Sequence, residues 1–486
     1  MKTLEEALDR NAVLEQEITF LKEELAQLKR LVFGHKKERF IPSDSTQQNL
    51  FEGEVETVEP ETETVTYQRD RSAKKTPKRL LLPAHLPRDE ETLTPEGISE
   101  EDTLIGKKVT EVLEYTPGKL WVKKTVRPVY KHKKEGKIKV ANLPTQVIPS
   151  GNPGASLLAY LLVSKFIDHL PFYRQVQIFK RDGIKIPEST ITGWFRKTCE
   201  LLDPLYDEML SRIRGTDYIQ ADESPVPVLS KDKPGSTHKG YQWVYHLPKE
   251  RMVIFRYDQS RRQSVPTAML NEFSGCLQTD GYAGYNEIAK RNGITHIACM
   301  AHARRKFEVA LENDQQRANH ALVEIQKLYA MERYFKENEV SPTQIKELRQ
   351  RDAVPVLNEL KRWLDDQYTQ VLPKSSMGKA IAYSLNICPQ LTAYTQNGEW
   401  DIDNNAVENK IRPLALGRKN YLFAGSHQAA QQAAMMYSLF GTCKLNGIEP
   451  LKWLTQTLEK LPDTKLNNLS DLLPISQENE CLIWLP

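Results

Sequence analysis

The chain has 486 residues, of which 40% are hydrophobic and 27% are charged, a composition typical of folded water-soluble proteins with roughly two to four domains. No apolar run is long enough to span a bilayer, the N-terminus MKTLEEALDR lacks the features of a signal peptide, and the net charge is only +3. The six cysteines are scattered without a C-x-x-C pair, which excludes a disulfide scaffold or a four-cysteine zinc cluster and favours a reducing cytoplasm.

Residues 1–40 are predicted to form a coiled-coil dimerisation helix. One core register is occupied by Leu4, Asn11, Ile18, Leu25 and Val32, and the other by Ala7, Leu14, Leu21 and Leu28. Apolar residues at this heptad spacing favour a paired helix, in which a core asparagine such as Asn11 fixes register and strand number. The alternative is a single amphipathic helix that packs on its own domain.

Two segments of different character follow the coiled coil. Residues 41–79 lack apolar periodicity and are rich in Glu, Thr, Ser and Gln, which predicts a flexible linker. Residues 80–150 alternate apolar and polar positions between turn signals, which predicts a small strand-rich module. Its stretch from Lys119 to Lys139 is basic, with Trp121 and Tyr130 interleaved. This pattern suits a nucleic-acid backbone, although a solvated sheet face explains the lysines equally well.

Residues 151–212 predict a helix-turn-helix. An apolar helix at 156–170 precedes a second helix, a turn at Asp182-Gly183, and a third helix expected from Ser189 to Leu202. In this motif the helix after the turn enters the major groove of DNA.

From residue 213 the pattern becomes α/β. Three strands, a helix, a strand, a helix and a strand are expected across residues 213–303, and this is the element order of an RNase-H-like domain. Residues 304–395 are almost wholly helical by pattern and would interrupt that domain. Residues 396–440 would complete it, and residues 441–486 form a C-terminal tail with one more helix.

Three carboxylates are candidates for one site. Asp222 falls in the first strand, Asp280 near the end of the fourth, and Glu408 on the helix that completes the domain. With Asp403 as the helix cap, Glu408 falls in the second turn and Arg412 lies four residues further on the same face. Adjacent strand ends and one helix bring such acids into an oxygen-ligand site that suits Mg²⁺. Two such ions about 3.5–4 Å apart clamp the attacking and leaving oxygens in phosphoryl transfer.

Other readings of these residues stay open at this point. Glu223 adjoins Asp222 but points to the opposite face of a strand. Asp401 and Asp403 compete with Glu408 for the third place, and Asp280 before Gly281 is also typical of a turn. The helix of Glu408 and Arg412 is equally compatible with a solvated surface that carries an ion pair.

The chain resembles the DDE transposases of the insertion-sequence 66 family over nearly its whole length. The resemblance is carried by LKRLVFGHKKERF near the N-terminus, LLPAHLPRDE from Leu81, LVSKFIDHLPFYRQ from Leu162, QADESPVPVL from Gln220, LQTDGYAGY from Leu277, CMAHARRKF from Cys299 and IDNNAVENKIRPLALGRKNYLFAGS from Ile402.

The resemblance implies that Asp222, Asp280 and Glu408 are the DDE triad and bind Mg²⁺, with Mn²⁺ as a substitute ion. It implies an RNase-H-like fold with a helical insertion and Mg²⁺-dependent cleavage and strand transfer at the terminal inverted repeats of an insertion sequence. The expected partners are double-stranded DNA, a second copy of the chain through the coiled coil, and small accessory proteins of the same element, without a membrane. A bacterial, nucleoid-associated cytoplasmic location follows. The candidate DNA contacts are His302, Arg304, Arg305, Lys306, Arg412, Arg418, Lys419, Ser189, Thr190 and Thr192.

Two other functions compete with the transposase. One is a catalytically inactive, domesticated DNA-binding protein, against which the presence of all three acids argues. The other is an RNase-H-like nuclease without strand transfer, against which the heptads and several DNA-binding modules argue.

One segment departs from the family pattern. Family members usually carry paired cysteines after the LPAHLPR-like segment, and these read as a zinc-binding module. Residues 89–149 contain no cysteine, and His132 alone does not make a tetrahedral zinc site. No structural zinc is therefore expected in the strand-rich module.

Overall fold

The computed structural model describes residues 145–149, 153–230 and 235–475, together with residues 118, 120, 129–131 and 138–140. The chain divides into two units, Met1–Asn142 and Leu143–Pro486. In the first unit, strands β1 (Val129–Lys131) and β2 (Ile138–Val140) pair antiparallel. This hairpin agrees with the strands expected there, whereas the predicted coiled coil and linker lie outside the described residues.

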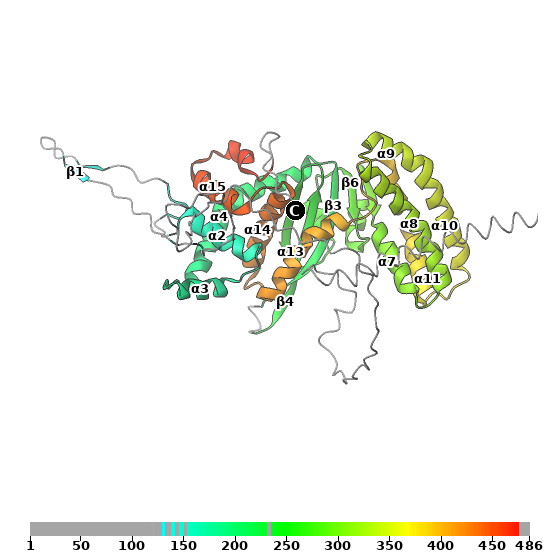
Figure 1. Ribbon diagram of the computed structural model, residues 1–486, viewed down its shortest axis with the longest axis horizontal. Coiled ribbons are helices and arrows are strands. Elements are labelled where there is room, and N and C mark those ends of the chain that lie inside the picture. The colour runs from blue at the N-terminus through cyan, green and yellow to red at the C-terminus, as the bar shows by residue number, and fades with distance from the viewer. Residues whose placement is uncertain are drawn as a thin grey trace, which may run out of the picture. The chain divides into compact units, whose positions relative to one another are not determined.

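A five-stranded mixed sheet forms the centre of the second unit (Figure 1). Its strands are β3 (Tyr218–Leu229), β4 (Thr237–Leu247), β5 (Met252–Asp258), β6 (Gly275–Thr279) and β7 (Ile294–Ala298). The spatial order is β5-β4-β3-β6-β7, in which β3, β4 and β5 pair antiparallel while β6 and β7 run parallel to β3. This mixed α/β core is consistent with the expected RNase-H-like domain.

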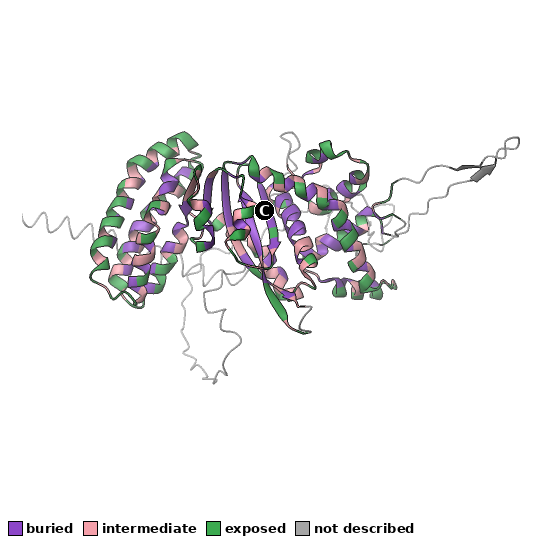
Figure 2. Cartoon of the chain, turned by 180° about the vertical axis from the view of Figure 1, so that it is seen from behind, coloured by how far each residue is buried: buried purple, intermediate pink, exposed green. Residues whose placement is uncertain are grey.

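Helices cover the sheet because its strands are apolar on both faces, as the buried strands in Figure 2 show. Helix α14 (His427–Leu445) lies along the edge strand β5. The backbone N–H groups of Phe255 and Val253 donate to Ser438 Oγ (2.7 Å) and Thr442 Oγ1 (3.2 Å) of that helix. These side chains satisfy donors that an edge strand would otherwise leave open.

The helix-turn-helix region consists of α2 (Ala155–Phe166), α3 (Phe172–Arg181) and α4 (Glu188–Ser211). Gly183 has φ +79° in the turn between α3 and α4, a conformation that glycine adopts without a steric cost. Helix α4 runs nine residues beyond the expected end at Leu202, because its apolar face continues to pack through Leu205 and Met209. Helix α15 (Pro450–Lys460), the helix expected in the tail, packs against α2.

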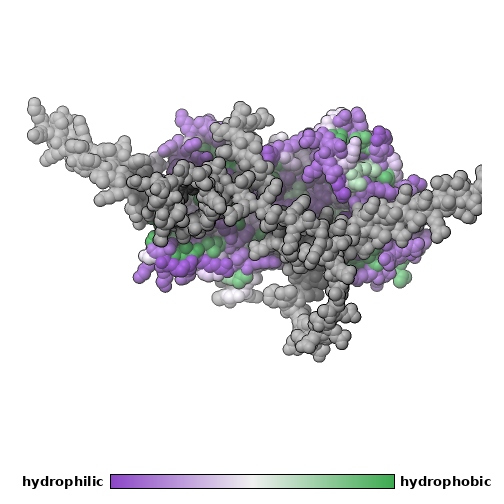
Figure 3. Space-filling model, in the orientation of Figure 1, coloured by the Kyte–Doolittle hydropathy of each residue, from purple (hydrophilic) through white to green (hydrophobic). Residues whose placement is uncertain are grey.

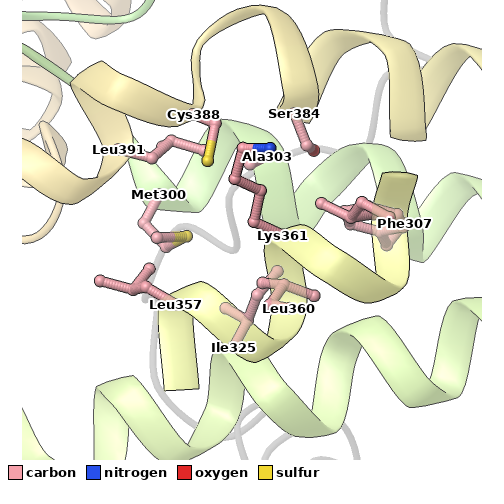
Figure 4. Close-up of a pocket in the computed structure, with 11 residues that line it drawn as sticks. Met300, Ala303, Phe307, Ile325, Leu357, Leu360, Lys361, Ser384, Cys388 and Leu391 are labelled. Atoms are coloured by element: carbon pink, nitrogen blue, oxygen red, sulfur yellow. The ribbon is translucent and has the colours of Figure 1, made fainter. Parts of the chain in front are cut away.

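The segment expected to be helical forms a bundle at the β7 end of the sheet (Figure 1). Its core contains an apolar cavity of about 20 Å³ lined by residues such as Met300, Phe307 and Leu360 (Figure 4). A cavity of this size holds no more than about one water molecule, so it is a packing defect and no ligand site. The helices are α7 (Met300–Ala310), α8 (Gln315–Glu337), α9 (Pro342–Leu348), the π-helix η4 (Arg349–Ala353), α10 (Val354–Tyr368), α11 (Ser376–Asn386) and α12 (Cys388–Thr392).

The chain returns to the sheet through α13 (Asn405–Tyr421), which packs on β3 and β4. The expectation that Asp403 caps this helix and that Glu408 lies in its second turn is wrong by one residue. The capping position is Asn404, and Glu408 lies in the first turn. Asp403 Oδ1 still accepts the N–H of Asn405 (3.0 Å), so the residue before the cap hydrogen-bonds to the first residue of the helix.

Candidate active site

The parallel pairing of β3 and β6 brings Asp222 and Asp280 together. Gln220 is paired with Gln278 across the two strands, and their side chains are joined by a hydrogen bond of 3.0 Å. Asp222 and Asp280 each follow two residues after one of these glutamines, so the same register places both carboxylates side by side on one face of the sheet. Asp280 comes directly after β6, where the backbone leaves the sheet.

Asn404 holds the start of α13 against the strand that carries Asp222. Its side-chain Nδ2 donates to the carbonyl of Ala221 (3.1 Å), and its backbone N–H donates to Cys299 Sγ (3.2 Å). Asn404 is completely buried. Because Glu408 lies one turn further along α13, these two bonds fix its carboxylate relative to the strand and to the start of α7.

The electrostatic surroundings of Asp222 include the two other acids of the candidate triad. Burial raises the pKa of Asp222 well above its usual value, and the nearby carboxylates of Asp280, Glu223 and Glu408 raise it further. One backbone N–H, that of Glu223, donates to Asp222 Oδ1 (2.7 Å) and partly offsets these effects. The site therefore brings several acids together, with the guanidinium of Arg261 at Glu223 and that of Arg305 near Glu408.

The competing acids all have structural partners. Glu223 pairs with the guanidinium of Arg261, whose Nε donates to Oε1 at 2.7 Å. Asp401 Oδ2 accepts Gln220 Nε2 (2.8 Å), and Asp403 Oδ2 accepts the hydroxyl of Tyr329 (2.9 Å).

Glu408 differs from these three acids. Its Oε1 has no hydrogen-bond partner among the described residues.

The cations of the HARRKF segment lie on α7 beside Glu408. His302 Nε2 is 3.7 Å from Glu408 Oε1, and an Arg305 nitrogen is 4.0 Å from Oε2. Burial lowers the pKa of His302 although Glu408 opposes this effect. Arg304 instead pairs with Glu308 on its own helix (3.4 Å), and Lys306 Nζ lies 4.4 Å from the ring centre of Tyr383.

The donor set at this site fits a hard cation. Asp222, Asp280 and Glu408 supply carboxylate oxygens close enough to influence one another electrostatically, and oxygen is the donor that Mg²⁺ prefers. Cys299, His302 and Glu408 also offer donor atoms within 4.8 Å of one another. Burial raises the pKa of the Cys299 thiol to about 12, so this sulfur is a protonated, poor ligand and acts as a hydrogen-bond acceptor for Asn404.

Comparisons with known proteins decide the family. A family model described as "Transposase IS66 family" matches residues 150–432, which is more than half of the chain. Models described as "IS66 C-terminal element" and "Transposase C of IS166 homeodomain" match residues 438–475 and 20–90.

The chain belongs to the IS66 family of transposases.

Similar proteins come from Sinorhizobium fredii. The uncharacterized protein y4jD is 32% identical over 93% of this transposase and 94% of its own length. The uncharacterized protein y4qI is 32% identical over 90% of this transposase and 85% of its own length. No solved structure matches the chain.

The remaining candidate DNA contacts of the transposase lie on two surfaces. Ser189 and Thr192 are exposed in the first turn of α4, and Thr190 is half-buried there. Arg412 and Lys419 are exposed on α13. Arg418 of α13 is half-buried and donates to the carbonyl of Pro225, so it holds the helix to β3.

Two groups at the site were not singled out from the sequence. Arg261 reaches Glu223 from the loop after β5, and it stacks on Tyr282 with its guanidinium 3.8 Å from the ring centre. Tyr383, on insertion helix α11, donates its hydroxyl to the carbonyl of Asp280 (3.0 Å). No local sequence signal identifies either contact, because each joins segments far apart in the chain.

A further signal was present in the sequence but went unused. Both acids on the strands occur in the pattern Gln-x-Asp, at 220–222 and 278–280. In the IS66 transposase this repeat reflects the pairing of Gln220 with Gln278, and Tyr218 Oη donates to the same Gln278 Oε1 (2.6 Å).

None of the helices in the described part of the chain is long and apolar enough to cross a membrane.

Proposed function

We propose that this transposase cleaves the ends of its own insertion sequence and joins them to target DNA in a Mg²⁺-dependent reaction, with Asp222, Asp280 and Glu408 as the metal-binding catalytic triad. The observation that carries the proposal is the buried Oε1 of Glu408, which accepts no hydrogen bond among the described residues and lies near two further acids. Buried charges are normally paired or hold a metal, so a group of buried carboxylates of this kind favours a bound cation. When bound, Mg²⁺ supplies electrostatic stabilisation of the charge that develops on phosphate oxygens.

The residues of the chain supply orientation around that ion. The N–H of Tyr282 donates to Asp280 Oδ1 (2.8 Å), and Tyr383 holds the carbonyl of the same residue. Asn404 fixes the helix of Glu408 to β3. These contacts keep the carboxylates in place before DNA arrives, which reduces the reorganisation that the reaction requires.

We propose that α7 contacts the DNA backbone. His302 and Arg305 flank Glu408, and the positive charge of Arg305 favours the approach of phosphate. We also propose that the start of α4 reads the major groove. We further propose that the coiled coil of residues 1–40 pairs two copies, so that two transposon ends are held together.

The test is strand cleavage and strand transfer on a labelled duplex that carries the terminal inverted repeat, read from the DNA that flanks the gene. We expect wild-type protein to cut and join this DNA with Mg²⁺ or Mn²⁺. Asp222→Asn and Asp280→Asn should each abolish both steps while a gel shift still detects binding. Because the two residues act as a unit, the double variant should be little worse than either single one.

Asp217→Asn is the matched control, since Asp217 is an exposed acid just before β3 that pairs with Lys249 (2.8 Å). It should cleave as wild type does. Cleavage without strand transfer by the wild-type protein would favour the nuclease alternative. Binding without any cleavage would favour the inactive DNA-binding alternative.

A further inference from the structure

A strained turn ends the helix that carries Glu408. Leu422 follows α13 with φ +63° and ψ −46°, and the N–H of Phe423 donates to the carbonyl of Tyr421 (2.7 Å). This is a three-residue turn with a left-handed central residue, which is rare and strained for an amino acid with a side chain. Among the four non-glycine residues with positive φ in the described part of the chain, Leu422 is the apolar one.

The turn is fixed on both sides. The N–H of Leu422 donates to the carbonyl of Arg418 (3.0 Å), which closes the last turn of α13. Two residues later, Ala424 exchanges hydrogen bonds of 2.9 Å with Pro227 and Leu229 of β3. Strain of this kind persists only where the surrounding structure enforces it, and it is typical of functional positions.

Both side chains at the turn are exposed although they are apolar. Leu422 is 64% exposed and Phe423 is 41% exposed. The fold thus holds two hydrophobic side chains in solvent at a conformational cost, which is the reverse of what stability alone favours.

The segment of the chain that carries this turn contains no acid. Residues 409–448 contain no Asp or Glu, while Lys410, Arg412, Arg418, Lys419 and Lys444 lie among them. Helix α3 of the helix-turn-helix is also free of acids, and its Arg174 donates to Asn420 Oδ1 (3.3 Å) beside the turn. Where Figure 3 shows the surface in colour, most residues are hydrophilic, and some hydrophobic residues lie at the lower left, where Figure 1 places α2 and α3.

Exposed apolar side chains in a segment that carries only basic charges fit a polyanion with an apolar interior, and duplex DNA is such a molecule. We infer that Leu422 and Phe423 form an apolar wedge that enters a base step of the duplex bound across α3 and the end of α13. Apolar side chains that enter base steps unstack and kink DNA, while neighbouring cations hold the phosphates. This inference rests on the proposed function, because it concerns the same DNA substrate.

The geometry sets where the distortion falls. Leu422 lies fourteen residues beyond Glu408 on a helix that rises 1.5 Å per residue, a separation of about 20 Å or about six base pairs. The wedge therefore opens the duplex at about that distance from the bond that the three acids cleave. A kink at this position bends the DNA between the helix-turn-helix and the active site.

The experiment uses the full-length protein and a terminal-repeat duplex in which 2-aminopurine replaces one base at a time. With wild-type protein, fluorescence should rise at a step about six base pairs from the cleavage site, because unstacking relieves quenching. Leu422→Ala and Phe423→Ala should each reduce this rise, and the double variant should lose it. Leu372→Ala should retain it, since Leu372 is 77% exposed in a loop of the helical insertion.

Thermal unfolding tests the strain independently of DNA. Leu422→Gly should raise the unfolding midpoint by about 1–3 °C, because glycine adopts positive φ without penalty, and should still lose the fluorescence rise. Leu372→Gly is the control and should not raise the midpoint. If Leu422→Gly lowers the unfolding midpoint by as much as Leu372→Gly does, the backbone at Leu422 is not strained.

Cleavage of the same duplexes separates the two proposals. If wild-type protein cleaves the DNA but no position brightens, or if the double variant brightens as wild type does, the wedge is wrong and the proposed function stands. If wild-type protein neither binds nor cleaves the DNA, the proposed function fails and the wedge fails with it.

Discussion

Charged side chains are buried both in the helical insertion and in the core around the sheet, but the two regions differ in how many hydrogen-bond partners these side chains have. In the insertion, Arg349 donates to both carboxylate oxygens of Glu332 (2.8 and 2.7 Å) and to the carbonyls of Tyr394 and Asn397. Its side chain is 3% exposed. In the core, the described residues supply Asp222 with one hydrogen-bond donor, the N–H of Glu223, and Glu408 Oε1 with none. A buried charge with all its partners is structural, whereas a cluster left short of partners is built for something that binds there.

The largest effect on stability is expected in the insertion. Arg349→Met removes the only cation that pairs with Glu332 among the described residues and leaves that carboxylate and two carbonyls short of donors. The free energy of unfolding should fall by about 3–5 kcal/mol. Urea denaturation followed by circular dichroism measures this change.

Arg351→Met is the control two residues away. Arg351 also pairs with a carboxylate, that of Asp352 (2.7 Å), but its side chain is 71% exposed. The unfolding free energy should stay close to that of the wild type, because an exposed pair is screened by solvent. If both variants lose the same free energy of unfolding, the buried ion pair of Arg349 stabilises the fold no more than the exposed ion pair of Arg351.

The second prediction concerns a buried neutral group beneath the active site. Burial lowers the pKa of His246 to about 4, with a smaller contribution from Lys410, and its Nδ1 lies 2.8 Å from Gln220 Oε1. The unfolded state, with the ordinary histidine pKa, binds a proton more readily than the folded state. This histidine therefore makes the fold lose stability as pH falls from about 6.5 to 4, by up to about 3 kcal/mol.

His246→Gln should remove that loss, because glutamine keeps a hydrogen-bonding group and cannot take up a proton. The measurement is the unfolding free energy at several pH values, with the exposed His238→Gln variant as control. If the pH dependence of His246→Gln equals that of wild type and control, the histidine is not held neutral by the core.

The smallest expected effect concerns an acid that the fold has already satisfied. Tyr329→Phe removes the hydroxyl that donates to Asp403 Oδ2 (2.9 Å) and leaves the contact of Asp403 with Asn405. The free energy of unfolding should fall by about 1 kcal/mol, the usual value for one hydrogen bond, and DNA cleavage should stay at the wild-type rate. A strong loss of cleavage with unchanged stability would move Asp403 from a structural role to a catalytic one.

Local patterns in the sequence predicted the order of elements around the site well. The alternation of apolar residues in 218–258 indicated three strands, and β3, β4 and β5 lie there. Their positions in the predicted strands singled out Asp222 and Asp280 among the acids, and the parallel register of β3 and β6 explains why both lie on one face. These features depend on residues close in the chain, which is why periodicity finds them.

Contacts between distant segments were not predicted. The bond from Asn404 to Ala221 spans 183 residues, and that from Tyr383 to Asp280 spans 103. Asp403 was the predicted helix cap, whereas Asn404 occupies the cap position and its side chain binds β3 instead of the helix. The predicted helix start was therefore wrong by one residue, because the cap was chosen from residue type alone.

The central claim is that Glu408, and no other acid before or on α13, completes the site with Asp222 and Asp280. The most direct measurement is Mg²⁺-dependent strand cleavage of one labelled transposon end by Glu408→Gln and Asp403→Asn, side by side, with binding checked by gel shift. The account predicts that Glu408→Gln binds the end but does not cleave it, since the amide cannot hold the cation. Asp403→Asn should cleave at close to the wild-type rate, because asparagine also accepts hydrogen bonds at a helix start. Near-normal cleavage by Glu408→Gln, with Asp403→Asn inactive, would contradict this claim, because the third metal-binding carboxylate would then be that of Asp403.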